Sequence, residues 1–355
     1  MRVGLLGAFS IDNPGDVFLG RAARAALLRS GVAVELFAPR LSHPSWGHDW
    51  SGARGVGAPI TPVPPGGSLE WTRGLDALII GGGGFLLPHP EHDVFLGAGA
   101  HCPTAWNGVC ALNGDLTNPA WMAKLRAGCA ALAHVSVRNA ASRDVLLRSG
   151  FGGEVAVIPD VALGLDLPAV DVGDVLARAG VDGRRRLVGL SVGRSVREPF
   201  FARLAGALAG LDADIVIFPF GNVYGDAEHA RVAAAALPRA KWIREPLAPL
   251  ALAGVIARMS LYVATRFHAM LAAFLQDVPF LVLDEYRPGA DRTSKIYELI
   301  KELGLEHRYL CPRLGGEPAA ALDRPAPDLA PARAALRARL DAHHRLMLAR
   351  LGVKP

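Results

Sequence analysis

Features common in secreted, zinc-binding and membrane proteins are missing from this sequence of 355 residues. Its four cysteines form no C-x-x-C pair, so neither a disulfide framework nor a cysteine zinc site is expected. No apolar run reaches the about 18 residues of a membrane-spanning helix, and the start MRVGLLGAFS is interrupted too early for a secretory signal. We therefore expect a cytoplasmic protein with reduced cysteines and no membrane span.

A concentrated basic segment is missing too. The net charge is +5, yet no basic block is longer than Arg184-Arg185-Arg186, and so short a run is typical of a solvated turn. We expect no nucleic-acid partner. A mild positive balance nevertheless suits a small anionic substrate.

The two common phosphate-binding glycine motifs are incomplete. Four glycines follow the strand-like segment LDALII at 81–84, but no third glycine completes G-x-G-x-x-G and no Gly-Lys-Ser/Thr follows. These gaps argue against a dinucleotide fingerprint and against a P-loop. Four glycines are still more than a tight turn needs, so Gly82 and Gly83 are predicted to let a substrate approach the backbone.

The chain alternates short apolar strands with alanine-rich helices. Strands of continuous apolarity, such as RVGLLGA, predict parallel sheets that are covered on both faces. A stretch rich in Pro, Gly and charge at 166–186 separates two such series. We predict an α/β fold of two doubly wound, Rossmann-like domains, 1–165 and 187–310, that face a cleft, followed by a tail and helix at 311–355.

Polar residues follow several predicted strands, at the ends where parallel sheets bind ligands. In the first domain these are Asn13 and Asp16 of NPGD, before the first helix, and Arg138 at the end of HVSVR. In the second domain they are Arg194 and Asn222, after LVGLSVG and DIVIFPFG. Ordinary turn, cap and surface chemistry explains NPGD and the second-domain pair about equally well.

An arginine and a histidine interrupt the apolar stretch SLYVATRFHAMLAAF. LYVAT predicts a strand and HAMLAAFLQ a helix, so Arg266, Phe267 and His268 form the connection between them. Residues two apart in an extended connection point the same way. We therefore expect Arg266 and His268 to converge on one anion while Phe267 enters the core; a paired arginine and a capping histidine are the less favoured interpretation.

The segment at 89–101 is rich in histidine. His89, Glu91, His92 and Asp93 match no known spacing of metal ligands. A solvated loop is the favoured interpretation, and we expect no metal.

Several segments together resemble the polysaccharide pyruvyl transferase family. The R-x-H element at 266–268, followed by a small-residue helix and a Val-Pro strand, is the most specific of them, and the resemblance extends over about residues 3 to 304. The segments are NPGD, DALIIGGGGFL, VSVRNAASRDVL, VIPDVAL, VGLSVGR, IFPF and ATRFHAMLAAFLQDVPFLVL. The resemblance implies a fold of the glycosyltransferase-B type.

The resemblance also implies an activity. Pyruvate is expected to move from phosphoenolpyruvate to one or two hydroxyls of a sugar, commonly as a ketal, with release of phosphate. Arg266 and His268 are then expected to contact phosphoenolpyruvate, with Arg138 as a further cation, since a carboxylate and a phosphate need at least two cations. His268 is the candidate general acid and Asp16 the candidate base or acceptor ligand. Phosphoenolpyruvate is the co-substrate, and no other cofactor is expected.

The segment DEYRPGADRTSK departs from the family pattern. It is longer than the usual tyrosine- and lysine-containing stretch and carries Glu285, Arg287 and Arg292, which leaves open the role of Lys295 and the acceptor, whether a glycan, a lipid-linked sugar or a small metabolite. A nucleotide-sugar glycosyltransferase on the same architecture is the alternative enzyme, although the sequence lacks an acidic pair for the ribose. A non-catalytic sugar- or anion-binding module is a third interpretation. The oligomeric state, a homo-oligomer included, is open.

Overall fold

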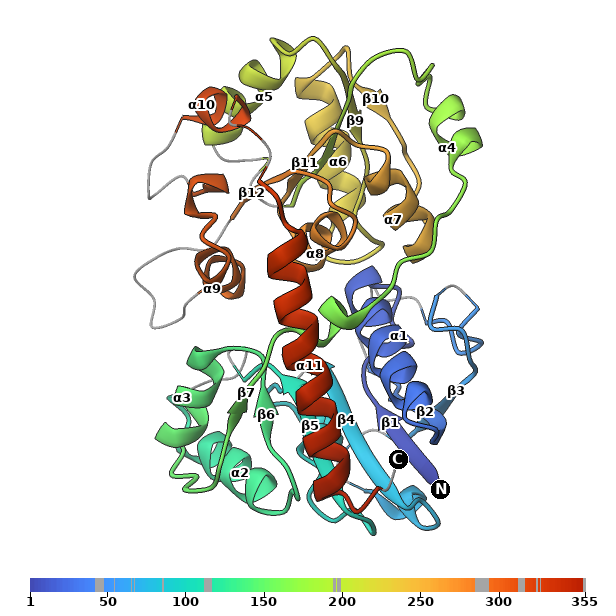
Figure 1. Cartoon of the computed structure of the whole chain (residues 1–355), viewed down its shortest axis with the longest axis vertical. Coiled ribbons are helices and arrows are strands. Elements are labelled where there is room, and N and C mark those ends of the chain that lie inside the picture. The colour runs from blue at the N-terminus through green and yellow to red at the C-terminus, as the bar shows by residue number, and fades with distance from the viewer. Residues whose placement is uncertain are drawn as a thin grey trace. The chain divides into compact units, whose positions relative to one another are not determined.

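The chain forms two compact α/β units, each built on a parallel sheet (Figure 1). Unit 1 comprises Met1–Ile11, Asp16–Leu165 and Ala334–Pro355, and unit 2 comprises Asp12–Gly15 and Asp166–Arg333. The computed structural model describes residues 1–41, 48–53, 55–64, 66, 68–84, 86–111, 117–193, 196, 199–284, 294–311, 317–323, 325 and 327–353.

Unit 1 is a seven-stranded sheet in the order β3-β2-β1-β4-β5-β6-β7, and neighbouring strands pair in parallel. The strands are β1 Arg2–Leu6, β2 Ala33–Pro39, β3 Ile60–Val63, β4 Ala77–Gly83, β5 Thr104–Val109, β6 Ser136–Val137 and β7 Ala156–Val157. The helices are, from Asp16 on, α1 Pro14–Arg29, then α2 Pro119–Ala130, α3 Ala140–Arg148 and, from Ala334 on, the last helix α11 Ala330–Arg350.

Unit 2 is a six-stranded parallel sheet in the order β10-β9-β8-β11-β12-β13. Its strands are β8 Leu187–Ser191, β9 Asp214–Ile217, β10 Lys241–Trp242, β11 Leu261–Ala264, β12 Phe280–Leu283 and β13 Tyr309–Leu310. Its helices are α4 Gly173–Arg178, α5 Pro199–Ala209, α6 Asp226–Ala236, α7 Pro249–Ala257, α8 Phe267–Leu275, α9 Lys295–Glu302 and α10 Pro318–Leu322. The predicted doubly wound α/β class is confirmed for both units.

In both sheets the order in which successive strands are added reverses at an internal strand. In unit 1 the order changes between β1 and β4, and in unit 2 it changes between β8 and β11. In open α/β sheets, ligands bind outside the carboxyl ends of the strands at this switch point. The connection after β11 therefore begins at the position in unit 2 where a ligand is expected.

Continuous apolarity produces the buried strands. All seven residues of β4 are buried, as are all four of β11, because helices cover both faces of these parallel sheets. In β4 a Cβ on Gly82 would come within 2.7 Å of Leu19 Cδ2 of α1. Helix α1 therefore packs closely on the strand at this glycine.

The elements that sequence patterns missed are short. They are β3, β13, α4, α9 and α10. Strand β3 is at the edge of its sheet, contains Pro62 and buries only its two end residues, so it lacks the apolar run of a covered strand. Helix α4 forms within the predicted linker at 166–186, and those residues group with unit 2.

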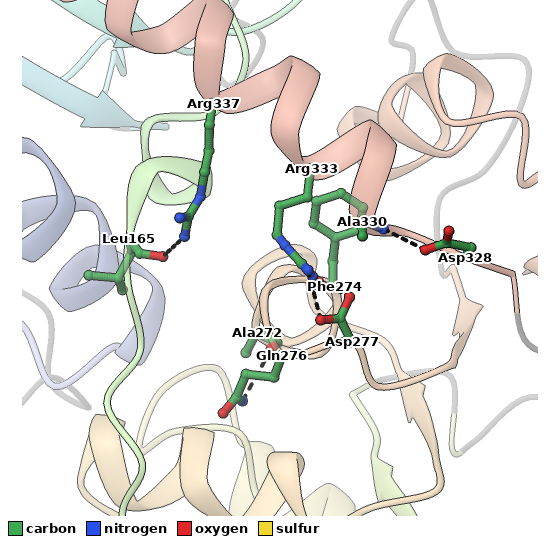
Figure 2. A network of polar contacts seen from close by, with 9 residues as sticks. All are labelled: Leu165, Ala272, Phe274, Gln276, Asp277, Asp328, Ala330, Arg333 and Arg337. Carbon is green, nitrogen blue, oxygen red and sulfur yellow. Dashed lines mark hydrogen bonds and ion pairs between the residues drawn. The ribbon is translucent and has the colours of Figure 1, made fainter.

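Two arginines one turn apart near the start of the last helix make different contacts (Figure 2). Within unit 2, Arg333 forms an ion pair with Asp277 and its Nη1 donates to Phe274 O over 3.1 Å. Within unit 1, Arg337 Nη2 donates to Leu165 O over 2.8 Å. Within the part of the chain that the structure describes, no helix is both long and apolar enough to cross a membrane.

The glycine at position 206 offers a stability test of this fold. Gly206 lies inside α5, and a Cβ there would meet no atom within 4 Å. Glycine costs a helix interior about 1 kcal/mol relative to alanine, so Gly206→Ala should raise the free energy of unfolding by up to about 1 kcal/mol. Denaturant unfolding of the two proteins measures the difference, and a lower midpoint for the variant would contradict the helix assignment.

Candidate active site

Arg266 and His268 occupy the turn between β11 and α8 in unit 2. The strand ends at Ala264, Arg266 is the N-cap of the helix, and His268 is its second residue. Phe267 is 6% exposed and enters the core, whereas Arg266 and His268 are partly exposed. The alternation predicted for this connection is therefore present, and both side chains lie at the rim of the sheet.

Arg266 has partners from the neighbouring β9–α6 connection. Its Nε donates to Asp226 Oδ1 over 3.1 Å, and its Nη2 donates to the same oxygen. The Asp226 side chain is 1% exposed and that of Arg266 28%. The ring of Tyr224 covers the guanidinium, with 4.9 Å from Arg266 Cζ to the ring centroid.

The backbone of the NPGD segment at Gly15 lies beside the His268 imidazole. Residues Asp12–Gly15 group with unit 2. A Cβ on Gly15 would come within 2.7 Å of His268 Cγ and nearer still to Nδ1, and a Cβ on Gly221 would come within 2.7 Å of Pro14 Cδ. The glycine of NPGD is thus required where the imidazole passes close to the backbone.

The Asn13 side chain lies at the start of α1. Asn13 Oδ1 accepts a hydrogen bond from Gly15 N over 3.1 Å, and the helix begins at Pro14. Asp16 lies in the first turn, where a carboxylate interacts favourably with the helix dipole. Its side chain is partly exposed, as is that of Asn13.

Arg138 lies in the interior of unit 1. Its Nη1 donates to Asp160 Oδ2 over 3.0 Å, and both side chains are 2% exposed. Burial disfavours its charged form, yet Cys110 and Asp160 beside it raise the pKa of Arg138 above its ordinary value. In this arrangement the guanidinium stabilises a buried carboxylate at the ends of β6 and β7.

The remaining predicted contacts are scattered. Gly82 and Gly83 are buried in β4, and Gly83 adopts a φ of 125° that favours glycine. Asn222 is exposed in the β9–α6 connection, two residues before Tyr224. Arg194 lies outside the described residues, as do Glu285, Arg287 and Arg292.

The histidine-rich segment at 89–101 is not the predicted solvated loop, because Pro90–Leu96 forms a short 3₁₀ helix that buries His92, Val94 and Phe95. Its polar side chains form ordinary pairs in unit 1. Lys124 Nζ contacts Asp93 Oδ2 at 2.7 Å, and His101 Nε2 contacts Glu70 Oε1 at 3.1 Å. Among the residues that the structure describes, no three histidine, cysteine or acidic side chains gather as a metal site.

Comparison by sequence decides the family. The model of the polysaccharide pyruvyl transferase family matches residues 13–285, a span that includes both NPGD and the Arg266-Phe267-His268 element. The chain belongs to the polysaccharide pyruvyl transferase family. No curated protein sequence matches it.

Solved structures show the fold that this pyruvyl transferase family member shares. The UDP-GlcNAc 2-epimerase of Methanocaldococcus jannaschii aligns with a TM-score of 0.58 at 10% identity, over 98% of this chain and 100% of that one. The S. aureus MnaA–UDP structure aligns at 0.57 and 13%, over 99% and 97%. Sucrose-phosphate synthase of Thermosynechococcus elongatus aligns at 0.52 and 14%, over 99% and 94%. The predicted glycosyltransferase-B-like architecture of the family member is confirmed.

Two groups in the pyruvyl transferase family member have partners that sequence patterns did not predict. In the sequence Asp226 is only a polar residue that follows a strand, and nothing near it in sequence points to Arg266, 40 residues away.

A second carboxylate, Asp284 at the end of β12, accepts hydrogen bonds from Ser294 Oγ and Tyr309 OH. Burial and then Asp284 raise the pKa of Tyr309, so this phenol stays a hydrogen-bond donor. Lys295 begins α9, with Nζ 5.8 Å from the Phe267 ring centroid.

Proposed function

We propose that this protein transfers the pyruvyl group of phosphoenolpyruvate to hydroxyl groups of a sugar-containing acceptor and releases phosphate. The observation that carries the proposal is the pair at the start of α8, where Arg266 and His268 share one partly exposed rim beside the NPGD backbone. Membership of the polysaccharide pyruvyl transferase family supports the reaction class.

The residue types suit the donor. Phosphoenolpyruvate carries a carboxylate and a phosphate, and a guanidinium binds either of them through two parallel hydrogen bonds. His268 lies in the first turn of α8, where backbone N–H groups and the helix dipole favour an anion. Phosphoenolpyruvate bound there would place one of its anionic groups between the Arg266 guanidinium and the imidazole of His268, the proposed proton donor.

In the proposed reaction, two acceptor hydroxyl groups add in turn to the same carbon of phosphoenolpyruvate. His268 donates a proton to the methylene carbon of phosphoenolpyruvate, which becomes a methyl group, while one acceptor hydroxyl adds to the neighbouring carbon and loses its proton. Phosphate then leaves that carbon with its bonding electron pair, and a second hydroxyl adds in its place to close the ketal while the departing phosphate takes up its proton. Asp16 is the proposed base that takes a hydroxyl proton.

The other predicted contacts belong to the same proposal. Arg138 and Arg194 stay predicted as further cations, and Asn13, Asn222, Gly82 and Gly83 as further substrate contacts. The acceptor is proposed to bind on the side of unit 1. A cytoplasmic location, predicted from cysteines of which all four are free, is part of the proposal as well.

The proposal predicts phosphate release that depends on both substrates. The purified protein is incubated with phosphoenolpyruvate and a panel of sugars, and phosphate and acceptor mass are followed. Phosphate should appear in proportion to acceptor that has gained one pyruvyl group, and neither should appear when either substrate is omitted. Consumption of a nucleotide sugar without use of phosphoenolpyruvate would instead identify the protein as a glycosyltransferase and overturn the proposal.

A further inference from the structure

We propose that Asp226 and Tyr224 are positioning residues that hold the Arg266 guanidinium ready for an anion. The inference rests on the proposed function for the identity of that anion as phosphoenolpyruvate. The positioning itself follows from contacts within unit 2, on the β9–α6 and β11–α8 connections.

Asp226 fixes one edge of the guanidinium. Its Oδ1 accepts from both Nε and Nη2 of Arg266, so the side edge of the planar group is occupied. The Asp226 side chain is 1% exposed, and Asp226 is the first residue of α6. A buried carboxylate is costly without a cation and a helix start beside it, and here it has both.

Tyr224 fixes one face of the guanidinium. Its ring centroid lies 4.9 Å from Arg266 Cζ, within the range of a cation–π contact. The residue itself is 50% exposed, so burial of the ring does not explain its position. Tyr224 also has a φ of 57°, and Gly225 beside it a φ of 76°. A left-handed tyrosine costs on the order of 1 kcal/mol, and in this conformation the ring of Tyr224 lies over Arg266.

The arrangement leaves the end of Arg266 available. Nη1 makes no hydrogen bond to any residue that the structure describes, and the side chain is 28% exposed. The end edge, Nη1 together with the second N–H of Nη2, points away from the oxygen that Asp226 supplies and can receive a carboxylate or phosphate through two bonds. An arginine already held in place loses less rotamer entropy when the anion binds.

The opposite role for Asp226 is competition. A carboxylate that neutralises Arg266 would weaken anion binding, and its removal would then tighten it. Positioning predicts the reverse sign, so the affinity of an Asp226 variant for anions separates the two.

The test compares Asp226→Asn, Tyr224→Leu and Tyr224→Phe with the wild-type protein. We expect Asp226→Asn to raise the KM for phosphoenolpyruvate about 10-fold with a smaller change in kcat, because a lost ground-state contact acts on binding. Tyr224→Leu should raise KM several-fold, whereas Tyr224→Phe, which keeps the ring, should restore the wild-type value. Arg231→Gln removes the exposed Glu228–Arg231 pair on the same helix and should leave KM unchanged.

Titration with phosphoenolpyruvate and with inorganic phosphate, without an acceptor, makes the outcome independent of turnover. Weaker binding by the Asp226 and Tyr224→Leu variants, matched by Arg266→Ala, supports positioning even if the wild-type protein transfers no pyruvate. Wild-type or tighter anion binding by Asp226→Asn overturns the inference and leaves the proposed function standing. Absence of any anion binding by the wild-type protein overturns it as well.

Discussion

Replacing Gly15 by alanine should slow phosphate release about 100-fold while leaving the protein folded. The new Cβ would lie within 2.7 Å of His268 Cγ and nearer to Nδ1, so the imidazole must turn away. Displacing a catalytic group by about 1 Å lowers the rate on the order of 100-fold. The backbone at Gly15 is helical, in the first turn of α1, and alanine is favoured there. Steady-state phosphate release and denaturant unfolding together measure both effects.

A double-mutant cycle makes this prediction sharper. His268→Gln removes the proposed proton donor and should itself slow release at least about 100-fold. If Gly15 acts through His268, adding Gly15→Ala to His268→Gln should slow the reaction little further. Gly206→Ala, a glycine with open space around it, is the matched control and should keep the wild-type rate. Wild-type turnover by Gly15→Ala, or fully multiplied losses in the double variant, would show that the two residues act separately.

Acidification from pH 7 to pH 5 should lower the free energy of unfolding by about 4 kcal/mol through two buried histidines alone. Both lie on the part of α11 that belongs to unit 1. His343 Nε2 lies 3.2 Å from Asn107 Oδ1, and His344 Nε2 lies 3.5 Å from Asn107 Nδ2. Burial, then the charge of His344, lowers the pKa of His343 to about 3, and burial lowers that of His344 to about 4.

The direction follows from proton uptake. The unfolded chain takes up a proton on each histidine near its ordinary pKa of about 6.5, whereas the folded chain does not until about pH 4 or 3. The unfolded state therefore binds more protons across this window, and stability falls as the pH falls. His134, whose ring lies 5.1 Å from that of His343, has its pKa lowered by burial in the same direction.

Unfolding curves of variants isolate this contribution from that of the carboxylates. His343→Gln keeps a polar side chain that can hydrogen-bond to Asn107, and should remove about half of the 4 kcal/mol difference between pH 7 and pH 5. His89→Gln, at an exposed position of the same unit, is the control and should leave the difference intact. An equal pH dependence in His343→Gln and wild-type protein would mean that His343 is already charged when folded.

Local pattern predicted most of the fold. Continuous apolar runs such as RVGLLGA and DALIIGG became covered parallel strands, because nothing but burial on both faces accommodates them. The apolar frame around Arg266 and His268 was sufficient to place both at a strand-to-helix turn. Edge strands and short helices such as β3 and α4 were missed, since a few half-exposed residues carry too little periodicity.

The sequence by itself determined which residue types stand after each strand, and hence that a cation and a titratable imidazole lie together at the rim of unit 2. Only the tertiary structure decided what those groups contact. Asp226 meets Arg266 across 40 residues of chain, Gly15 meets His268 across far more, and Arg138 is bound to Asp160 inside unit 1. The two arginine–aspartate pairs depend on strand order within each sheet, and the Gly15–His268 contact depends on the grouping of residues 12–15 with unit 2. In each case the separation in sequence carries no local signal.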